Sequence, residues 1–370
     1  MTATLATRAA PALLAAAYVH LDRLSDDTAL FEHARYATPR REHGYCLDDV
    51  ARGLLVLCRD DSPSGLGCAP DSGSDGAPDS VSDGVIRDRL VERYLAFVTH
   101  AQSPGGRSHN RLAFDRRWRD EPGLGDWWGR GLWGLGTAAA RSRQPSIRAN
   151  ARHAFETGAS RRSPWLRSMA FAALGAAEVL SVSPADRVAR ELLADAATMI
   201  TRVEPGADWP WPEPRLAYAN AVLPEVLIAA GAYLGDGDAS EYGLELLDWL
   251  LEVETDQASG CLSPTGSRGW VTGEPRPCFD QQPIEAAALA DACARAYAVT
   301  GDERWVHRGV ERAVGWFLGE NDARTPLHDP YTGGAYDGLL EDGHSQNQGA
   351  ESTLALISTL QQGIACTRPR

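Results

Sequence analysis

The sequence predicts an all-α fold, an (α/α)6 toroid in which six outer helices surround six inner ones. Two kinds of predicted helix alternate along the chain. One kind is amphipathic with a charged outer face, and the other is apolar on nearly every side. The alternation repeats every 40–60 residues or so, a period typical of helical-hairpin arrays. A polar and aromatic segment also recurs just ahead of the apolar helices, and we expect six such pairs to close into a ring.

The outer helices are predicted from charged residues on one face and apolar residues at helical spacing on the other. They are expected over residues 5–24, 86–98, 147–155, 187–200, 242–253 and 305–318. The inner helices are rich in Ala, Gly and Leu, and helices that are apolar all round belong in the middle of a protein. They are expected over residues 47–58, 132–139, 168–180, 221–232, 284–298 and 350–364. Strand signals are scarce, with one small hairpin expected in 260–271.

The 370 residues are long enough for one large toroidal domain, predicted over 1–370. Residues 60–84 are Gly, Ser, Asp and Pro with little apolar content, and they predict a flexible insertion within that domain. The net charge of −14 argues against nucleic-acid and anionic-membrane partners, which favour basic surfaces. No apolar run reaches the ~20 residues of a membrane span.

A cytoplasmic location is predicted from the cysteines and the N-terminus. The seven cysteines include no Cys-x-x-Cys pair, and Cys58, Cys293 and Cys366 lie in apolar helical stretches, where reduced thiols are expected. The alanine-rich N-terminus lacks the basic start of a signal peptide beyond Arg8, and its apolar pattern continues as an amphipathic helix.

The recurring polar segment brings carboxylates, amides and aromatic residues to the same end of several helices. It occupies residues 43–49, 125–128, 162–165, 209–213, 279–283 and 346–351. In a toroid these helix N-termini meet at one mouth, where unpaired N–H groups and positive dipole ends point. We therefore expect these segments to face a shared funnel of the kind that binds sugars.

Three of these junctions carry the strongest catalytic candidates. Asp48 and Asp49 open the first inner helix, and since one acid suffices as a cap, the other is free to face the funnel. Asp280 precedes Pro283 at a standard helix start. Yet Gln281, Gln282 and Glu285 exceed what capping requires, and an acid on an apolar helix needs a partner. At the last junction Asp337, Asn347, Gln348 and Glu351 suit hydroxyl recognition, although Glu351 also fits a capping box.

The remaining candidates are loop residues expected to bind substrate. Tryptophans in polar loops near acids commonly form platforms for sugar rings, or else anchor their loops on the core. These are Trp118, Trp127, Trp128, Trp209, Trp211 and Trp270. Beside them lie His43, Tyr45, Asp115, Arg116, Asp126, Glu213 and Asn220, with Asp115 and Arg116 equally readable as a structural ion pair.

No cofactor is predicted. The histidines show no metal-ligand spacing, and the chain has neither a Walker loop nor a dinucleotide-binding glycine motif after a strand.

Two motifs resemble a bacterial family of six-hairpin, glycosidase-like proteins that occur alone or fused to family-4-type glycosyltransferases. They are the Phe-Asp-Gln-Gln-Pro-Ile-Glu-Ala run from Phe279 and the Asn-Gln-Gly-Ala-Glu-Ser run from Asn347. The resemblance covers nearly the whole chain except 60–84. It implies the (α/α)6 fold, a carbohydrate context and a glycosyltransferase as a candidate partner. This sequence departs from the family pattern at Gly125 and Ala219, where an acid is usual, and at Trp128, where histidine is usual.

The predicted function is hydrolysis of a manno- or gluco-type oligosaccharide by two carboxylates, with inversion by analogy with other toroidal glycosidases. Asp49 and Glu351 are the first pair, with Asp280 and Asp48 in reserve. Two alternatives stay open: a sugar 2-epimerase working through histidines such as His43 and His344, and a non-catalytic glycan-binding partner of a glycosyltransferase.

Overall fold

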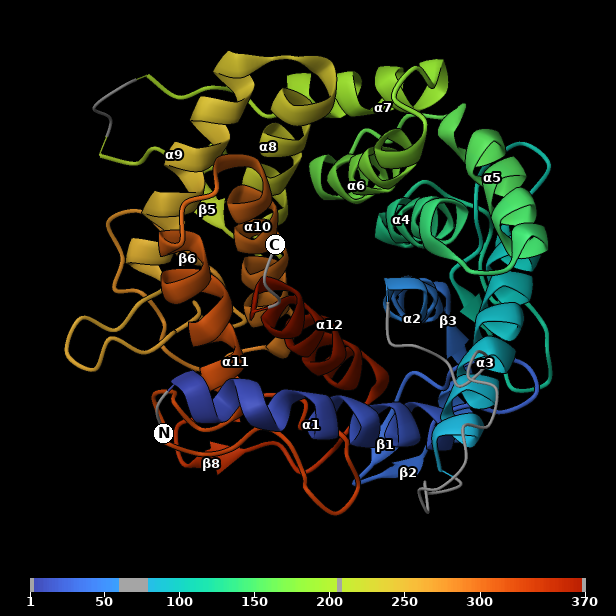
Figure 1. Cartoon of the computed structure of the whole chain (residues 1–370), viewed down its shortest axis with the longest axis horizontal. Coiled ribbons are helices and arrows are strands. Elements are labelled where there is room, and N and C mark those ends of the chain that lie inside the picture. The colour runs from blue at the N-terminus through green and yellow to red at the C-terminus, as the bar shows by residue number, and fades with distance from the viewer. Residues whose placement is uncertain (1–2, 60–78, 205–207, 368–370) are drawn as a thin grey trace, which may run out of the picture.

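Twelve α-helices form two concentric rings in the computed structural model, which describes residues 3–59, 79–204 and 208–367 (Figure 1). The outer ring consists of α1 (Ala3–Arg23), α3 (Asp79–Ala101), α5 (Pro145–Ala159), α7 (Arg187–Thr198), α9 (Gly237–Val253) and α11 (Glu311–Phe317). The inner ring consists of α2 (Leu47–Arg59), α4 (Asp126–Arg141), α6 (Leu166–Val182), α8 (Val222–Leu234), α10 (Pro283–Thr300) and α12 (Ala350–Thr367). The predicted (α/α)6 toroid and its alternation of helices are confirmed.

Closure of the ring rests on the inner helices. Each of them contacts the next, and α12 contacts both α10 and α2, so that the sixth helix meets the first. Small residues permit this proximity. Gly136 of α4 and Gly175 of α6 face each other so closely that a Cβ on either would overlap the backbone of the other helix. The inner ring is therefore a backbone-to-backbone contact rather than an interlocking of large side chains.

Two outer helices, α7 and α9, begin with the expected capping chemistry. Asp186 and Asp236 accept hydrogen bonds from the N–H groups of Ala189 and Ala239 at the starts of α7 and α9. Four inner helices differ: α4, α6, α8 and α10 begin without a hydrogen bond from an N-cap side chain. Their N-termini meet at the mouth, where their first N–H groups are left to other partners.

Four short antiparallel sheets tie the mouth loops together. They pair β1 (Ala34–Arg35) with β2 (Thr38–Pro39), β3 (Tyr45–Cys46) with β4 (Arg111–Leu112), β5 (Arg215–Leu216) with β6 (Trp270–Val271), and β7 (Leu339–Leu340) with β8 (Gly343–His344). The hairpin predicted within 260–271 is wrong. Its only strand, β6, pairs with β5 from the loop before α8, and so links two neighbouring junctions.

Two other predictions need correction. Residues 79–84, predicted as part of the flexible insertion, belong to α3, while 60–78 lie outside the described residues. The helix predicted over 305–318 exists, but it opens as a π-helix, η2 (Val306–Val310), before α11.

A buried charge network crosses the ring at the end of α2 remote from the mouth. The Arg59 guanidinium lies 2.8 Å from Asp291 of α10 and 4.0 Å from Glu178 of α6. Arg141 of α4 contacts Glu178 at 2.6 Å. The two pairs of Arg59 join α2 to α6 and to α10, inner helices that do not follow it directly in the chain.

The six cysteines among the described residues are free thiols, as predicted; Cys58 and Cys293 are buried and Cys366 is partly buried. In the same part of the chain, none of the helices combines the length and apolar character that a membrane crossing requires.

Candidate active site

A cavity of about 990 Å³ opens at the N-terminal ends of the inner helices. It draws on all of the junctions that the sequence singled out, so the expected common mouth exists. The predicted residues that line it are Asp48, Asp49, Asp126, Trp127, Glu213, Gln282, Asp337 and Glu351.

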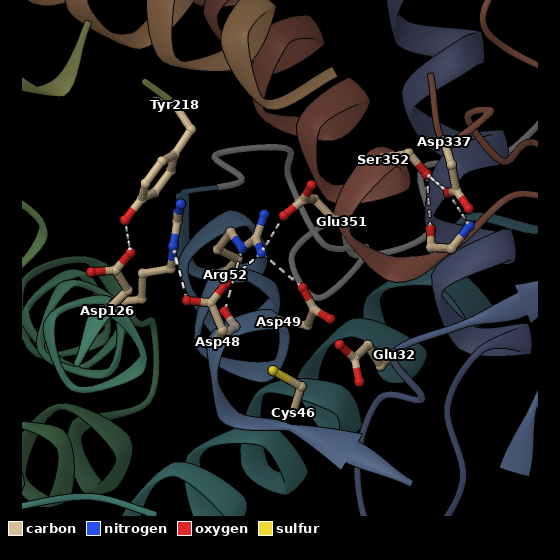
Figure 2. Close-up of polar contacts among 12 residues, drawn as sticks. Glu32, Cys46, Asp48, Asp49, Arg52, Asp126, Tyr218, Asp337, Glu351 and Ser352 are labelled. Atoms are coloured by element: carbon tan, nitrogen blue, oxygen red, sulfur yellow. Dashed lines mark hydrogen bonds and ion pairs between the residues drawn. The ribbon is translucent and has the colours of Figure 1, made fainter. Parts of the chain in front are cut away.

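Arg52 stands at the centre of the acidic side of this cavity (Figure 2). Its Nη2 lies 2.5 Å from Asp48, 2.9 Å from Asp49 and 2.9 Å from Glu351. Asp48 and Asp49 lie four and three residues before Arg52 on α2, a spacing that puts their side chains on the same helix face as Arg52. Glu351 reaches it from the first turn of α12, across the point where the ring closes.

The two adjacent aspartates differ in the direction of their pKa shifts. Burial raises the pKa of Asp49 well above its ordinary value, and Arg52 offsets this only in part. Burial acts on Asp48 too, but Arg130, 3.0 Å away, and Arg52 outweigh it and lower the pKa of Asp48. The surroundings thus favour the protonated form of Asp49 and the ionised form of Asp48.

A second group lies on the other side of Arg52, where the Tyr218 hydroxyl donates to Asp126 at the start of α4 (Figure 2). The adjoining Trp127 lines the cavity and donates through its indole N–H to the carbonyl of Ser108 at 2.7 Å. Trp165, which immediately precedes α6, also lines the cavity and is 65% exposed.

Arg167 holds the neighbouring loop. Its Nη2 lies 2.7 Å from Glu213, and its guanidinium donates to the carbonyl of Tyr218 at 2.8 Å and to Asn220 at 3.1 Å. Asn220 is buried beneath the cavity, where the Glu285 carboxylate accepts from the backbone N–H groups of Ala219 (2.5 Å) and Asn220 (3.3 Å). These contacts fix the turn that presents Tyr218.

The last part of the wall comes from loops. Glu32 pairs with Arg111, and both line the cavity. Asp337 accepts hydrogen bonds from the N–H of Gly349 and the hydroxyl of Ser352, both at 2.7 Å (Figure 2). Asp337 thereby supports the N-terminus of α12, which carries Glu351.

Several residues predicted to bind substrate are instead buried structural groups that do not line the cavity. The Tyr45 hydroxyl donates to Asp26 at 2.6 Å, and the indole N–H of Trp128 donates to Gly106 at 3.0 Å. Gln281 accepts from the indole of Trp316 at 2.8 Å. The set consists of Tyr45, Trp128, Trp211, Asn220, Gln281, Glu285 and Gln348.

Another group of predicted residues lies outside the cavity in the surrounding loops. Asp280 is exposed and does not line the cavity. Arg116 pairs with Asp27, not with its neighbour Asp115, and Trp118 stacks on His109. Trp209 and Trp270 pack edge to face against each other. The set consists of His43, Asp115, Arg116, Trp118, Trp209, Trp270, Asp280 and Asn347.

Other lining residues were not predicted as site residues, notably Glu32, Arg52, Arg111, Trp165, Arg167 and Tyr218. A signal existed for Arg52, because an arginine three and four residues after two acids on one helix is placed to pair with them. Arg167 could also have been predicted from the sequence, because it is a charged residue on an otherwise apolar helix and such a residue needs a partner. Glu32 and Arg111 lie in loops, and only the folded chain brings them together.

Gly125 and Ala219, where the resembled family was expected to carry an acid, each have a distinct local geometry. A Cβ at Gly125 would overlap the ring of Trp127, so the indole occupies the space of a side chain at 125. Ala219 has φ +45°, a left-handed conformation held by the contact of its N–H with Glu285.

Two groups of side chains in the described part of the chain place possible metal-ligand atoms within 4.8 Å of one another: Asp48, Asp49 and Glu351, and Glu32, Cys46 and Asp49. In the first group the Arg52 guanidinium already contacts all three carboxylates. The positive charge of this guanidinium balances part of the negative charge of the three carboxylates, as a bound cation would.

No protein-family profile and no curated protein sequence matches this chain. Solved structures do match its fold. A sugar epimerase from a ruminal bacterium aligns with a TM-score of 0.67 at 12% identity, over 95% of this chain and 96% of the other. Cellobiose 2-epimerase from Spirochaeta thermophila aligns with a TM-score of 0.66 at 11% identity, over 99% of each chain. A cellulase of C. cellulolyticum in complex with cellobiose aligns with a TM-score of 0.63 at 9% identity, over 97% and 99%. The chain thus has the six-hairpin (α/α)6 fold that these proteins share.

Proposed function

We propose that the chain is a carbohydrate-active enzyme that hydrolyses a glycosidic bond in a manno- or gluco-type oligosaccharide. The observation that carries the proposal is a buried acid with a raised pKa, Asp49, next to a second carboxylate, Glu351, in a cavity walled by acids and aromatic rings. Glycosidases need this combination of one proton donor and one carboxylate. The cellulase with this fold, solved with cellobiose, supports the proposal, whereas the two epimerases support the second candidate below.

In the proposed mechanism Asp49 is the general acid. Arg52 donates to its Oδ1, which assigns the proton of the neutral carboxyl to Oδ2. Asp49 gives this proton to the glycosidic oxygen as the bond to the leaving sugar breaks, and the Glu351 carboxylate bonds to the anomeric carbon. Asp49, now ionised, then takes a proton from the water that hydrolyses the glycosyl–enzyme bond.

The spacing of these carboxylates changes the stereochemical prediction. Oxygen atoms of Asp49 and Glu351 lie within 4.8 Å of each other. Inverting enzymes need roughly 6.5–9.5 Å to admit a water, whereas retaining pairs stand about 5 Å apart. The predicted inversion therefore does not fit this pair, and we propose retention of configuration.

Asp48 has a supporting role in this scheme. It contacts both Arg52 and Arg130, and so fixes the guanidinium that orients the catalytic pair. It is a positioning residue rather than the proton donor.

The first test is incubation of the purified chain with α- and β-linked manno- and gluco-oligosaccharides. Asp49→Asn and Glu351→Gln are each expected to lower the rate of product release by about 10²–10⁴-fold, since each removes one arm of the mechanism. Asp238→Asn and Glu241→Gln, exposed positions on α9, are the matched controls. Unchanged rates in the two cavity variants would rule out the proposed pair, and NMR of the first-formed anomer tests retention.

A 2-epimerase is the second candidate, favoured by one observation: His33 lines the cavity, and the His43 ring packs against it with centroids 4.8 Å apart. His344 instead stacks on Tyr336, outside the cavity. Formation of a 2-epimer without cleavage, lost in His33→Asn, would select this reading. The non-catalytic reading, the glycosyltransferase partner and the cytoplasmic location stay predictions.

A further inference from the structure

The mouth has an aromatic side opposite the acidic one. Inner helices follow one another around the ring in chain order, so α6 stands three places from α12 and faces it across the centre (Figure 1). Trp165 immediately precedes α6, and Glu351 lies in the first turn of α12. The indole and the proposed catalytic carboxylate therefore approach the cavity from opposite walls.

Trp165 differs from the other tryptophans of the mouth loops. Trp128 and Trp211 are buried, and Trp209 and Trp270 pack on each other, whereas Trp165 leaves 65% of its surface exposed while lining the cavity. Its backbone is fixed, with φ −99° and ψ 127° and an N–H that donates to Ser163 at 3.1 Å. A large apolar surface held open on a rigid backbone in a polar cavity is suited to stack on a ligand ring.

Polar groups line the same cavity as this indole. They include Tyr218 and Glu213 from one loop and the carboxylate of Asp126, which accepts from the Tyr218 hydroxyl. A pyranose presents an apolar face of C–H groups for stacking and hydroxyl donors at its edge, which carboxylates accept.

The charge of the wall selects among sugars. The carboxylates that line the cavity are Glu32, Asp48, Asp49, Asp126, Glu213, Asp337 and Glu351. The lining arginines are Arg52, Arg111 and Arg167, and each is already paired with one or more of these acids. A uronate or phosphate would meet excess negative charge and find each of these guanidinium groups already engaged, whereas an uncharged sugar carries no charge for the carboxylates to repel.

The size of the cavity indicates more than one ring. Its volume of about 990 Å³ lies at the upper end of the roughly 300–1,000 Å³ of ligand pockets that bury drug-sized molecules. A single ring at the Asp49–Glu351 pair would leave the Trp165 side empty.

We propose that Trp165 is the platform of a second sugar subsite, and that the substrate is an uncharged oligosaccharide of at least two rings. One ring lies at Asp49 and Glu351, and a neighbouring ring stacks on the indole. This inference rests on the proposed function, since it names the substrate class of the same site.

The test compares binding and turnover of uncharged manno- and gluco-oligosaccharides of one to five rings, by calorimetry on Glu351→Gln and by rate on the otherwise unaltered chain. Affinity is expected to rise from one ring to two or three. Trp165→Ala is expected to lower affinity for the longer sugars by roughly three- to tenfold and to remove the length dependence. Trp165→Phe keeps an aromatic face for stacking and is expected to retain most of the affinity and of its dependence on sugar length. Tyr331→Ala, at a 95% exposed side chain outside the cavity, is the control.

The outcomes separate this inference from the proposed function. Hydrolysis with no effect of Trp165→Ala on affinity or KM would overturn the subsite and leave the hydrolase intact. Length-dependent binding that needs Trp165, with no cleavage of any sugar, would support the subsite and count against the hydrolase. Binding of an oligouronate as tight as that of its uncharged counterpart would overturn the charge argument.

Discussion

At the scale of single residues, Asp48 and Asp49 are neighbours in the chain with opposite electrostatic roles. Asp48 contacts two guanidinium groups, and its pKa is lowered, while Asp49 shares one of them, and burial raises its pKa. Pairs of titratable groups whose surroundings push their pKa values apart are typical of acid–base sites. A shift of one residue along α2 thus separates the aspartate whose surroundings favour a proton donor, Asp49, from the one whose surroundings favour the ionised form, Asp48.

Glu285 was predicted to bind substrate, but it is buried and does not line the cavity. Its carboxylate accepts from the backbone N–H groups of Ala219 and Asn220, at the left-handed Ala219 turn. Burial, and then the neighbouring Glu254 carboxylate, raise the pKa of Glu285 to about 7.

This raised pKa predicts a pH-dependent stability. The folded chain keeps the Glu285 proton up to about pH 7, whereas the unfolded chain releases it near the ordinary pKa of 4.5. The contribution of Glu285 to the free energy of unfolding is therefore complete below pH 4.5 and falls by about 3 kcal/mol as the pH rises to 7.

Denaturant unfolding of the parent chain and of Glu285→Gln at several pH values tests this. The free energy of unfolding of the parent chain, relative to that of Glu285→Gln, is expected to fall as the pH rises from 4.5 to 7. A difference that stays constant over this range would refute the raised pKa, because other titrating groups cancel in the comparison.

The sequence predicted the acids of the site better than its aromatic residues. Asp49 and Glu351 were expected at the mouth because acids stand out at the starts of apolar helices, and both line the cavity. Trp128 and Trp211 were expected there too but are buried away from it, because local sequence does not tell whether a loop side chain turns toward the core. Glu32 and Arg111 meet only through the β3–β4 and loop contacts of the folded chain.

At the scale of elements, the contact of α4 with α6 depends on glycine. The Cβ of an alanine at 136 would overlap the carbonyl oxygen of Gly175, whereas one at Gly131, on the same helix, would stand 3.8 Å from the side chain of Leu47. Of these two glycines on α4, Gly131 has room for a Cβ and Gly136 does not.

Gly136→Ala is expected to lower the free energy of unfolding by about 2 kcal/mol, because the overlap forces α4 away from α6. Gly131→Ala is expected to leave it unchanged or raise it by up to about 1 kcal/mol, since alanine favours the helix. Chemical denaturation of the two variants measures this. Equal effects would show that the interhelical approach is not the constraint.

Helices were predicted well because their apolar periodicity is local, and each inner helix carries its own signal of burial. Strands were not. The two-residue β5 and β6 come from different junctions, and their pairing depends on the ring that places those junctions side by side. The π-helical start of the last outer helix left no trace in the spacing of apolar residues.

At the scale of the whole molecule, Arg59 joins α2 to α6 and α10 across the ring, with its side chain and both partner acids buried. Arg59→Met removes the charge and leaves Asp291 and Glu178 less well compensated. The expected loss of unfolding free energy is about 3–5 kcal/mol, the usual cost of breaking a buried ion pair.

The matched control is Arg187→Met on α7, where the pair with Glu191 is exposed and contributes less than about 1 kcal/mol. Thermal and urea unfolding of both variants provides the measurement. Similar stability of the two would mean that the network does not tie the ring together.

The pairing of Arg52 with Glu351 has a consequence for biosynthesis. The two residues are separated by 299 positions, and α12 also contacts α1 and α2. Translation at about 5–20 residues per second leaves about 15–60 s between the emergence of one partner and the other. Over that interval the nascent chain holds apolar helices without their final neighbours, so chaperones that shield such surfaces are expected to associate with it. The acidic pocket is then the last region to assemble, when the twelfth helix leaves the ribosome.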